Sequence, residues 1–184
     1  MKRYLFFILL SITAIANSFS QSPGKKAALW EHVLHQRLPL LGHRNWILIV
    51  DKAFPAQTSS GMEVLNTQCD ILETLNKTLS QLNVSDHVKP IIYLDKELNY
   101  LTPAQIPQIE DFRNKYKELF KSYPVQTLLH ESVFSKLDEA SKLFKIIVLK
   151  TDCLIPYSSV FIELDCKYWN EKGEQELRKS MEKQ

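Results

Sequence analysis

Two hydrophobic spacings alternate along the chain. Short uninterrupted apolar runs predict strands buried on both faces, and apolar residues that recur every three or four positions predict helices with one buried side. The runs occupy residues 46–50, 90–94, 125–129, 145–150 and 160–164. Strands that alternate with helices favour a sheet covered on both faces. The expected fold is therefore α/β: one three-layer α/β/α sandwich whose sheet is largely parallel or mixed.

The helical spacing predicts four helices in the body of the chain. A first helix is expected from residue 28 until Pro39 ends it near Gln36 or Arg37. A long helix is expected over residues 62–82, and another carries the apolar positions of residues 109–120. Ser132 is expected to cap a fourth helix that reaches residue 144. Residues 170–184 are rich in charge and nearly free of apolar residues apart from Leu177 and Met181, which predicts a solvated helix or a frayed end.

The first twenty residues have the pattern of a secretory signal peptide. Lys2 and Arg3 precede the apolar residues 5–10, and the small residues Ser18 and Ser20 follow. The apolar run is too short to span a bilayer, which needs about 20 residues. Cleavage is expected after Ser20, which leaves a domain over residues 21–169, a charged tail over 170–184 and a secreted or periplasmic protein.

The charge balance argues against a polyanionic partner. The sequence has 23 basic and 21 acidic residues, and removal of Lys2 and Arg3 leaves 21 of each. No basic stripe stands out, so nucleic acid is not expected as a partner. No second apolar run approaches spanning length, so no membrane contact is expected after cleavage.

Three cysteines in an exported chain leave at least one without a partner in the same chain. Cys69 falls on the apolar side of the predicted helix 62–82, where it acts as a small hydrophobic residue. Cys153 and Cys166 flank the predicted strand 160–164, and whether they pair is left open. No Cys or His spacing resembles a zinc site, so no metal is expected.

Polar residues directly follow three of the predicted strands. Asp51, Asp95 and His130 each stand at such a strand end. Ligands of open α/β sheets bind outside the carboxyl ends of the strands, so these side chains are candidates for one site. His43 lies eight residues before Asp51, at the opposite end of the first strand. Only a folded entry loop or a neighbouring subunit would bring His43 to the same pocket.

Three segments, in order, resemble the ribose pyranase and fucose mutarotase family. Residues 41–55 read LGHRNWILIVDKAFP, with the Gly-His pair, the apolar strand, the Asp eight residues after the His and the later apolar-Pro pair of that family. Residues 129–134, LHESVF, resemble its second histidine at a strand end before a helix. Residues 150–162, KTDCLIPYSSVFI, resemble its Pro-Tyr closing motif. The resemblance extends from about residue 30 to residue 168.

The resemblance implies an isomerase that interconverts sugar anomers or ring forms without a cofactor or a metal. Histidine suits the proton transfers of ring opening because its unperturbed pKa is about 6.5. His43 would be the first acid/base group, with Asp51 orienting it or binding a sugar hydroxyl. His130 would be the second polar group. Tyr157 would form a hydrogen bond or shuttle a proton, in the pocket of a neighbouring subunit of a homo-oligomer. The remaining substrate contacts would come from Ser159 and Asn45.

Two departures from the family pattern leave other functions open. Asn45 stands where the family usually has an acidic residue, and Ser159 stands where its closing motif ends in Asn. An exported, non-catalytic monosaccharide-binding protein of the same fold is therefore the alternative, and a domain without a sugar site is a third. The retained histidines and tyrosine favour the enzyme.

Overall fold

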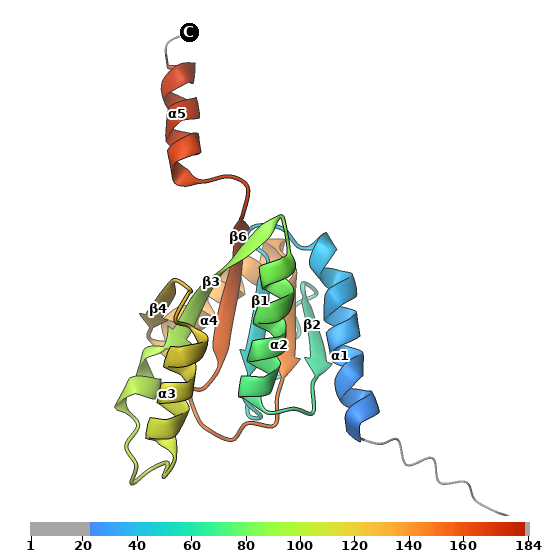
Figure 1. Cartoon of the computed structure of the whole chain (residues 1–184), viewed down its shortest axis with the longest axis vertical. Coiled ribbons are helices and arrows are strands. Elements are labelled where there is room, and N and C mark those ends of the chain that lie inside the picture. The colour runs from blue at the N-terminus through green and yellow to red at the C-terminus, as the bar shows by residue number, and fades with distance from the viewer. Residues whose placement is uncertain (1–22, 183–184) are drawn as a thin grey trace, which may run out of the picture.

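A six-stranded sheet forms the centre of the computed structural model, which describes residues 23–182 (Figure 1). The strand order is β2-β5-β1-β6-β3-β4. Strand β6 runs antiparallel to its neighbours β1 and β3, whereas the other pairs are parallel. The expected mixed sheet is therefore confirmed. The strands are β1 (Trp46–Val50), β2 (Met62–Asn66), β3 (Val88–Asp95), β4 (Val125–Leu128), β5 (Ile146–Lys150) and β6 (Val160–Cys166).

Helices cover both faces of the sheet, which confirms the three-layer α/β/α fold. Helices α1, α2 and α3 lie on one face, α4 lies on the other, and α5 projects beyond the end of β6 (Figure 1). The α-helices are α1 (Pro23–Arg37), α2 (Ile71–Val84), α3 (Ile109–Leu119), α4 (His130–Leu143) and α5 (Glu171–Met181), and the 3₁₀ helices are η1 (Leu38–Leu40) and η2 (Lys96–Tyr100).

Strand β1 shows how one apolar run serves two cores. All five of its residues are buried. Ile47 and Ile49 join the core under α1, α2 and α3, whereas Leu48 and Val50 join the core under α4. Successive side chains of a strand point to opposite faces, so an uninterrupted apolar run is what a central strand between two helical layers requires.

The single helix predicted over residues 62–82 is wrong. Residues Met62–Asn66 form β2, which extends the sheet beside β5, and α2 begins only at Ile71. Asp70 caps α2, because its side chain accepts a hydrogen bond from the amide of Leu72 at 2.8 Å. The apolar residues of β2 fit helical spacing by coincidence, and the polar segment that ends in Asp70 marks the boundary between the two elements.

The charged tail forms α5, which has no buried residue. The predicted signal peptide lies outside the described residues. Cys69, Cys153 and Cys166 all lie within the described range and carry free thiols, so the bridge left open above is not formed. Among the described residues, no helix is both long enough and apolar enough to cross a membrane.

Candidate functional site

The candidate site lies where β1 and β3 end and β6 begins. We call this edge of the sheet, at which β1 to β5 all end, the carboxyl edge; the opposite edge is the amino edge. Because β6 runs antiparallel between β1 and β3, its first residues reach the same edge as the last residues of its neighbours. Strands lie about 4.8 Å apart, so the ends of β1 and β3 are about 10 Å from one another. Three separate chain segments therefore meet there.

His130 and Asp95 form the central pair of this edge. The Nδ1 atom of His130 lies 2.9 Å from Oδ2 of Asp95. The Asp95 side chain is completely buried, whereas that of His130 is 38% exposed. The other ring nitrogen, Nε2, forms no hydrogen bond with any residue that the structure describes. One side of the imidazole is thus held by the protein, and the other side is left for a ligand or for water.

Burial raises the pKa of Asp95 to about 6, because the ionised carboxylate loses its hydration. The hydrogen bond from His130 acts in the opposite direction, whereas the negative charges of Glu97 and Asp51 raise the pKa further. The second carboxylate oxygen, Oδ1, is buried and has no hydrogen-bond partner within residues 29–182. The environment of Asp95 therefore favours a state in which the His130–Asp95 pair keeps a proton.

Glu97 fixes the start of α4. Both of its carboxylate oxygens lie 3.1 Å from the backbone nitrogen of His130, which donates to them. The free amides of a helix N-terminus attract negative charge, so Glu97 acts as a cap supplied by another element. The expected cap at Ser132 is wrong, because the helix begins two residues earlier, after Leu129.

Aromatic rings surround the His130 imidazole. Phe134, one turn further along α4, lies 4.7 Å from it between ring centroids, and Tyr157 meets it edge-on at 5.4 Å. Phe54, in the segment after β1, stacks on Phe134 at 5.5 Å. These contacts restrict the rotation of the imidazole and create an apolar wall beside a polar edge. Such a combination suits a sugar, whose ring has both CH and hydroxyl groups.

Tyr157 is held in an unusual backbone conformation. Its φ angle is 57°, in the left-handed region that aromatic residues rarely adopt. Ser158 stabilises this turn, because its hydroxyl donates to the carbonyl of Ile155 at 2.7 Å and its own carbonyl accepts from the hydroxyl of Tyr116. Tyr157 remains 37% exposed and contacts His130 of its own chain. The expectation that this tyrosine reaches the pocket of a neighbouring subunit stays a prediction.

Asp51 and Ser159 bind one another across the edge. The Ser159 hydroxyl donates to Oδ2 of Asp51 at 3.1 Å and accepts from the Asp51 amide at 3.2 Å. The other carboxylate oxygen of Asp51 accepts from the amide of Ala53 at 2.8 Å. Asp51 keeps partial exposure, whereas Ser159 is almost fully buried. Ser159 therefore holds Asp51 in this structure, and Asp51 is the more exposed member of the pair.

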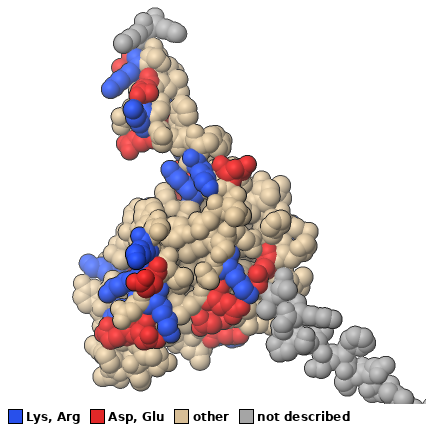
Figure 2. Space-filling view, in the orientation of Figure 1, with Lys and Arg blue, Asp and Glu red and all other residues tan. Residues whose placement is uncertain are grey.

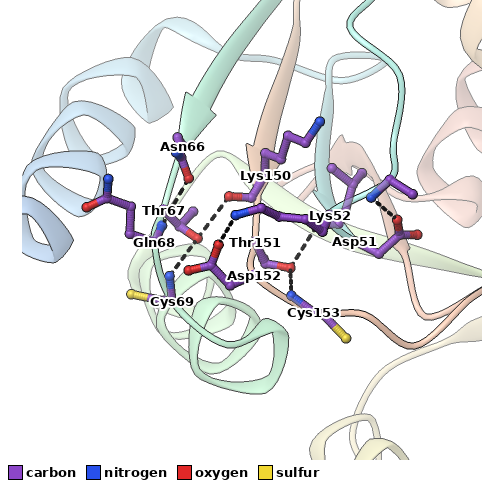
Figure 3. A network of polar contacts seen from close by, with 12 residues as sticks. Asp51, Lys52, Asn66, Thr67, Gln68, Cys69, Lys150, Thr151, Asp152 and Cys153 are labelled. Carbon is purple, nitrogen blue, oxygen red and sulfur yellow. Dashed lines mark hydrogen bonds and ion pairs between the residues drawn. The ribbon is translucent and has the colours of Figure 1, made fainter.

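Two threonines secure the neighbouring strand ends in the same way (Figure 3). The Thr67 hydroxyl, after β2, donates to the carbonyl of Lys150 on β5, and the Thr151 hydroxyl, after β5, donates to the carbonyl of Val50 on β1. Each hydroxyl also accepts from the amide of a cysteine two residues later, at 3.3 Å in both cases. These bonds fix the point at which each loop leaves the sheet.

His43 and Asn45 lie at the amino edge, before β1. The five residues of β1 alone span about 16 Å. His43 lines a hollow of about 670 Å³ at the base of α5, together with Tyr168 and Trp169. The Asn45 side chain accepts from the amide of Gly42 at 2.7 Å and donates to the carbonyl of Lys145 at 3.2 Å. A single chain therefore brings Asp51, His130, Tyr157 and Ser159 together and leaves His43 and Asn45 apart.

Two further charged residues belong to the site. Asp95 is the candidate that its place at a strand end predicts, and Glu97 is added by the structure. The signal that identifies them is the segment Asp95-Lys96-Glu97 at the end of a buried strand, but their pairing with His130 depends on contacts between distant elements.

Within the described residues, no group of three or more His, Cys, Asp or Glu side chains is placed to hold a metal ion. Basic and acidic side chains lie beside one another on the face drawn in Figure 2.

Comparisons with known proteins show similarity in structure but not in sequence. Neither a protein-family model nor a curated protein matches the chain. Bacillus subtilis RbsD, solved in complex with D-ribose, superposes with a TM-score of 0.52 at 18% identity and covers 85% of this chain and 98% of its own. The fucose mutarotase of Streptococcus pneumoniae, solved in complex with L-fucose, has a TM-score of 0.50 at 20% identity and covers 72% of this chain and 91% of its own.

These similarities bear on the fold. The two neighbours come from the proteins that the sequence motifs resemble, and each is covered over nine-tenths or more of its length. The chain therefore has the fold of the ribose pyranases and fucose mutarotases.

Proposed function

We propose that this protein is a sugar isomerase of the mutarotase or pyranase type, which interconverts the anomers or ring forms of a monosaccharide without a cofactor. The support comes from the carboxyl edge, which combines a titratable histidine, a tyrosine, a carboxylate and an apolar wall. The proteins that share the fold were solved with D-ribose and L-fucose, which makes these two sugars the first substrates to consider.

The reaction requires two proton transfers and no redox step. The anomeric hydroxyl gives its proton to a base while the bond between the anomeric carbon and the ring oxygen breaks. The ring oxygen takes a proton from an acid, and the sugar becomes an open-chain aldehyde. Closure from the other face of the carbonyl gives the opposite anomer, and closure through a different hydroxyl gives the other ring size. Every proton taken up is returned, so the protein ends in its starting state.

His130 and Tyr157 are the groups that the geometry favours for these transfers. The free Nε2 atom of His130 can take or give a proton near neutral pH, as general acid/base catalysis requires. Tyr157 lies edge-on to this ring and can donate a hydrogen bond to the sugar from the adjoining side. Asp51 accepts hydrogen bonds from sugar hydroxyls, and Ser159 keeps the Asp51 carboxylate in place. The single observation that carries the proposal is the exposed, unbonded Nε2 atom beside Tyr157.

A homo-oligomer would extend this site. His43 and Asn45, at the amino edge of one copy, would meet the carboxyl edge of another, so that His43 serves as a second acid/base group. Tyr168 and Trp169 are exposed at the same edge as His43 and offer an apolar contact for such an assembly. The proposal places the assembled protein outside the cytoplasm, in accordance with the signal-peptide pattern of the first twenty residues.

One observation favours the alternative, a monosaccharide-binding protein without turnover. The two residues that depart from the family pattern are both engaged internally: Ser159 bonds to Asp51, and Asn45 bonds to the backbone of Gly42 and Lys145. Neither is free to replace the acidic residue and the amide that the family uses. Binding by Asp51 and the aromatic wall would remain in this case.

The test is magnetisation-transfer NMR on ribose, fucose, galactose and glucose with the full mature chain. The proposal expects faster exchange between anomers for at least one of these sugars, in proportion to protein concentration. The matched comparison is the double variant Asn45→Asp with Ser159→Asn, which restores the family residues. Exchange in this variant but not in the natural chain would support the binding protein, and binding with no exchange in either chain would overturn the isomerase. If neither chain binds any of these sugars, the similarity to the sugar isomerases is limited to the fold.

A further inference from the structure

We propose that Asp95 is a positioning residue, which holds His130 with its Nδ1 proton directed at the buried carboxylate so that Nε2 alone exchanges protons with the sugar. This inference rests on the proposed function for its role in the reaction. The state of the His130 ring itself can be measured without any sugar.

The geometry defines which nitrogen is available. Nδ1 lies 2.9 Å from Oδ2 of Asp95, within hydrogen-bond distance, and Nε2 points away from the pair. A ring nitrogen that donates to a carboxylate fixes the proton on that nitrogen, so the lone pair must lie on the other one. The hydrogen bond from the His130 backbone amide to Glu97 fixes the backbone at this residue, and the ring contact with Phe134 restricts rotation of the imidazole. The protein thus specifies one tautomer of His130.

Because Asp95 is buried, it also affects how strongly the Asp95–His130 pair holds a proton. Its carboxylate is fully buried, and Oδ1 has no partner within the described side chains. A buried, incompletely bonded negative charge is costly, so the pair is more stable when it holds a second proton. That second proton resides on Nε2 in either arrangement of the pair, as an imidazolium beside a carboxylate or as a neutral imidazole beside a carboxylic acid. The pair therefore titrates as a unit at Nε2.

The charged and titratable groups around this pair act in the same direction. Glu97 approaches from η2, Asp51 from the end of β1 and Tyr157 from the turn before β6. The two carboxylates add negative charge beside the pair. Negative charge beside the ring favours Nε2 as the acid toward the ring oxygen. Loss of the Asp95 charge must then move the rate profile to lower pH.

The experiment uses the variants Asp95→Asn and Asp95→Leu, with Glu163→Gln as the matched control. Glu163 is a carboxylate on the neighbouring strand β6 that accepts a hydrogen bond from Tyr93 at 2.9 Å and does not contact His130. The first readout is the ¹⁵N resonance of the His130 ring in the sugar-free protein. In the unchanged chain and in Glu163→Gln, raising the pH should remove the proton from Nε2 and leave Nδ1 protonated. In Asp95→Leu this preference should be lost.

The second readout is the pH dependence of sugar exchange. Both Asp95 variants should lower the exchange rate at least about tenfold, within the range that general acid/base groups contribute, and should move the pH midpoint down. The Michaelis constant should stay unchanged, because a fully buried Asp95 cannot touch the sugar. If the unchanged chain loses its proton from Nδ1 instead, or if Asp95→Leu keeps both the tautomer and the pH midpoint, the positioning role is refuted. The expected tautomer without any sugar exchange would refute the isomerase and leave the Asp95–His130 assignment standing.

Discussion

His130 and His87 lie at opposite edges of the same sheet and use their ring nitrogens differently. His87 has both nitrogens occupied: Nε2 lies 3.0 Å from the carbonyl oxygen of Leu41, and Nδ1 lies 3.0 Å from the hydroxyl of Ser85 and 3.2 Å from Oδ1 of Asp86. Nε2 donates to the Leu41 carbonyl, because a carbonyl oxygen can only accept. His130 has only Nδ1 occupied, by Asp95. The count of occupied nitrogens distinguishes a structural histidine from one that is free to exchange a proton.

The hydrogen-bond partners of the two histidines also differ. The partners of His87 are a backbone carbonyl, a hydroxyl and the fully exposed carboxylate of Asp86, which hold the start of β3 against the segment after α1. The partner of His130 is a buried carboxylate with one unbonded oxygen. The amino edge thus ends in satisfied contacts, whereas the carboxyl edge keeps an incomplete one. Incomplete contacts inside a folded chain are costly, and they are retained where a ligand or a reaction uses them.

The largest expected difference between the two histidines is in turnover. His130→Ala should lower the sugar exchange rate about 10²- to 10⁴-fold, because a general acid/base group is lost. His87→Ala should leave the rate per folded molecule unchanged, since neither ring nitrogen of His87 is available. Magnetisation-transfer NMR on both variants measures the difference. Equal losses in the two variants would show that occupancy of the nitrogens does not identify the working histidine.

The second expected effect is the pH dependence of stability at the carboxyl edge. The folded pKa of Asp95, about 6, is above the unfolded value of about 3.8, so its stabilising contribution is complete below pH 4 and is lost as the pH rises through 6. Asp95→Asn should therefore gain stability relative to the unchanged chain between pH 4 and pH 8, by up to about 3 kcal/mol. Urea unfolding of both chains across this range measures the gain. A constant difference would show that the carboxyl of Asp95 is not perturbed.

The smallest expected effect is structural and belongs to the amino edge. His87→Ala removes two hydrogen bonds at a partly buried position and should lower the free energy of unfolding by about 1 to 3 kcal/mol. The same measurement on His130→Ala should show a loss of stability that grows as the pH rises, because that change leaves the Asp95 carboxylate buried without its partner. A loss at His87 below about 0.5 kcal/mol would mean that its contacts are not made in solution.

The fold followed from the sequence more closely than the site did. The uninterrupted apolar runs identified five of the six strands. Four of them are central strands, which must be apolar on both sides because they lie between two helical layers, whereas β4 is an outermost strand and mostly exposed. Strand β2 was missed, since it is an outermost strand of the sheet and its exposed positions interrupt the apolar run. Helical spacing extended across it by chance, and only the capping role of Asp70 separates the strand from the helix.

The positions of the site residues could be predicted from the sequence, but the contacts between them could not. The strand-end rule placed Asp51, Asp95 and His130 at one edge, and the structure agrees. No rule of spacing shows that Asp95 contacts the imidazole, because 35 residues separate the two and the contact depends on how α4 leaves β4. The internal bonds of Ser159 depend in the same way on the pairing of β6 with β1. Contacts between distant elements are set by packing, which one sequence does not reveal.

The threonine bonds at the ends of β2 and β5 have a consequence for the motions of the chain. Strand ends usually fray, and the loops that follow them open with little free energy. Here the hydroxyls of Thr67 and Thr151 each bond the carbonyl of a neighbouring strand, so opening of one strand end requires the next to open as well. The two bonds join β2, β5 and β1 into one cooperative unit, and the segment that carries Asp51 starts from its fixed end. Local opening at the carboxyl edge should therefore be confined to the β3 and β4 side, where His130 lies.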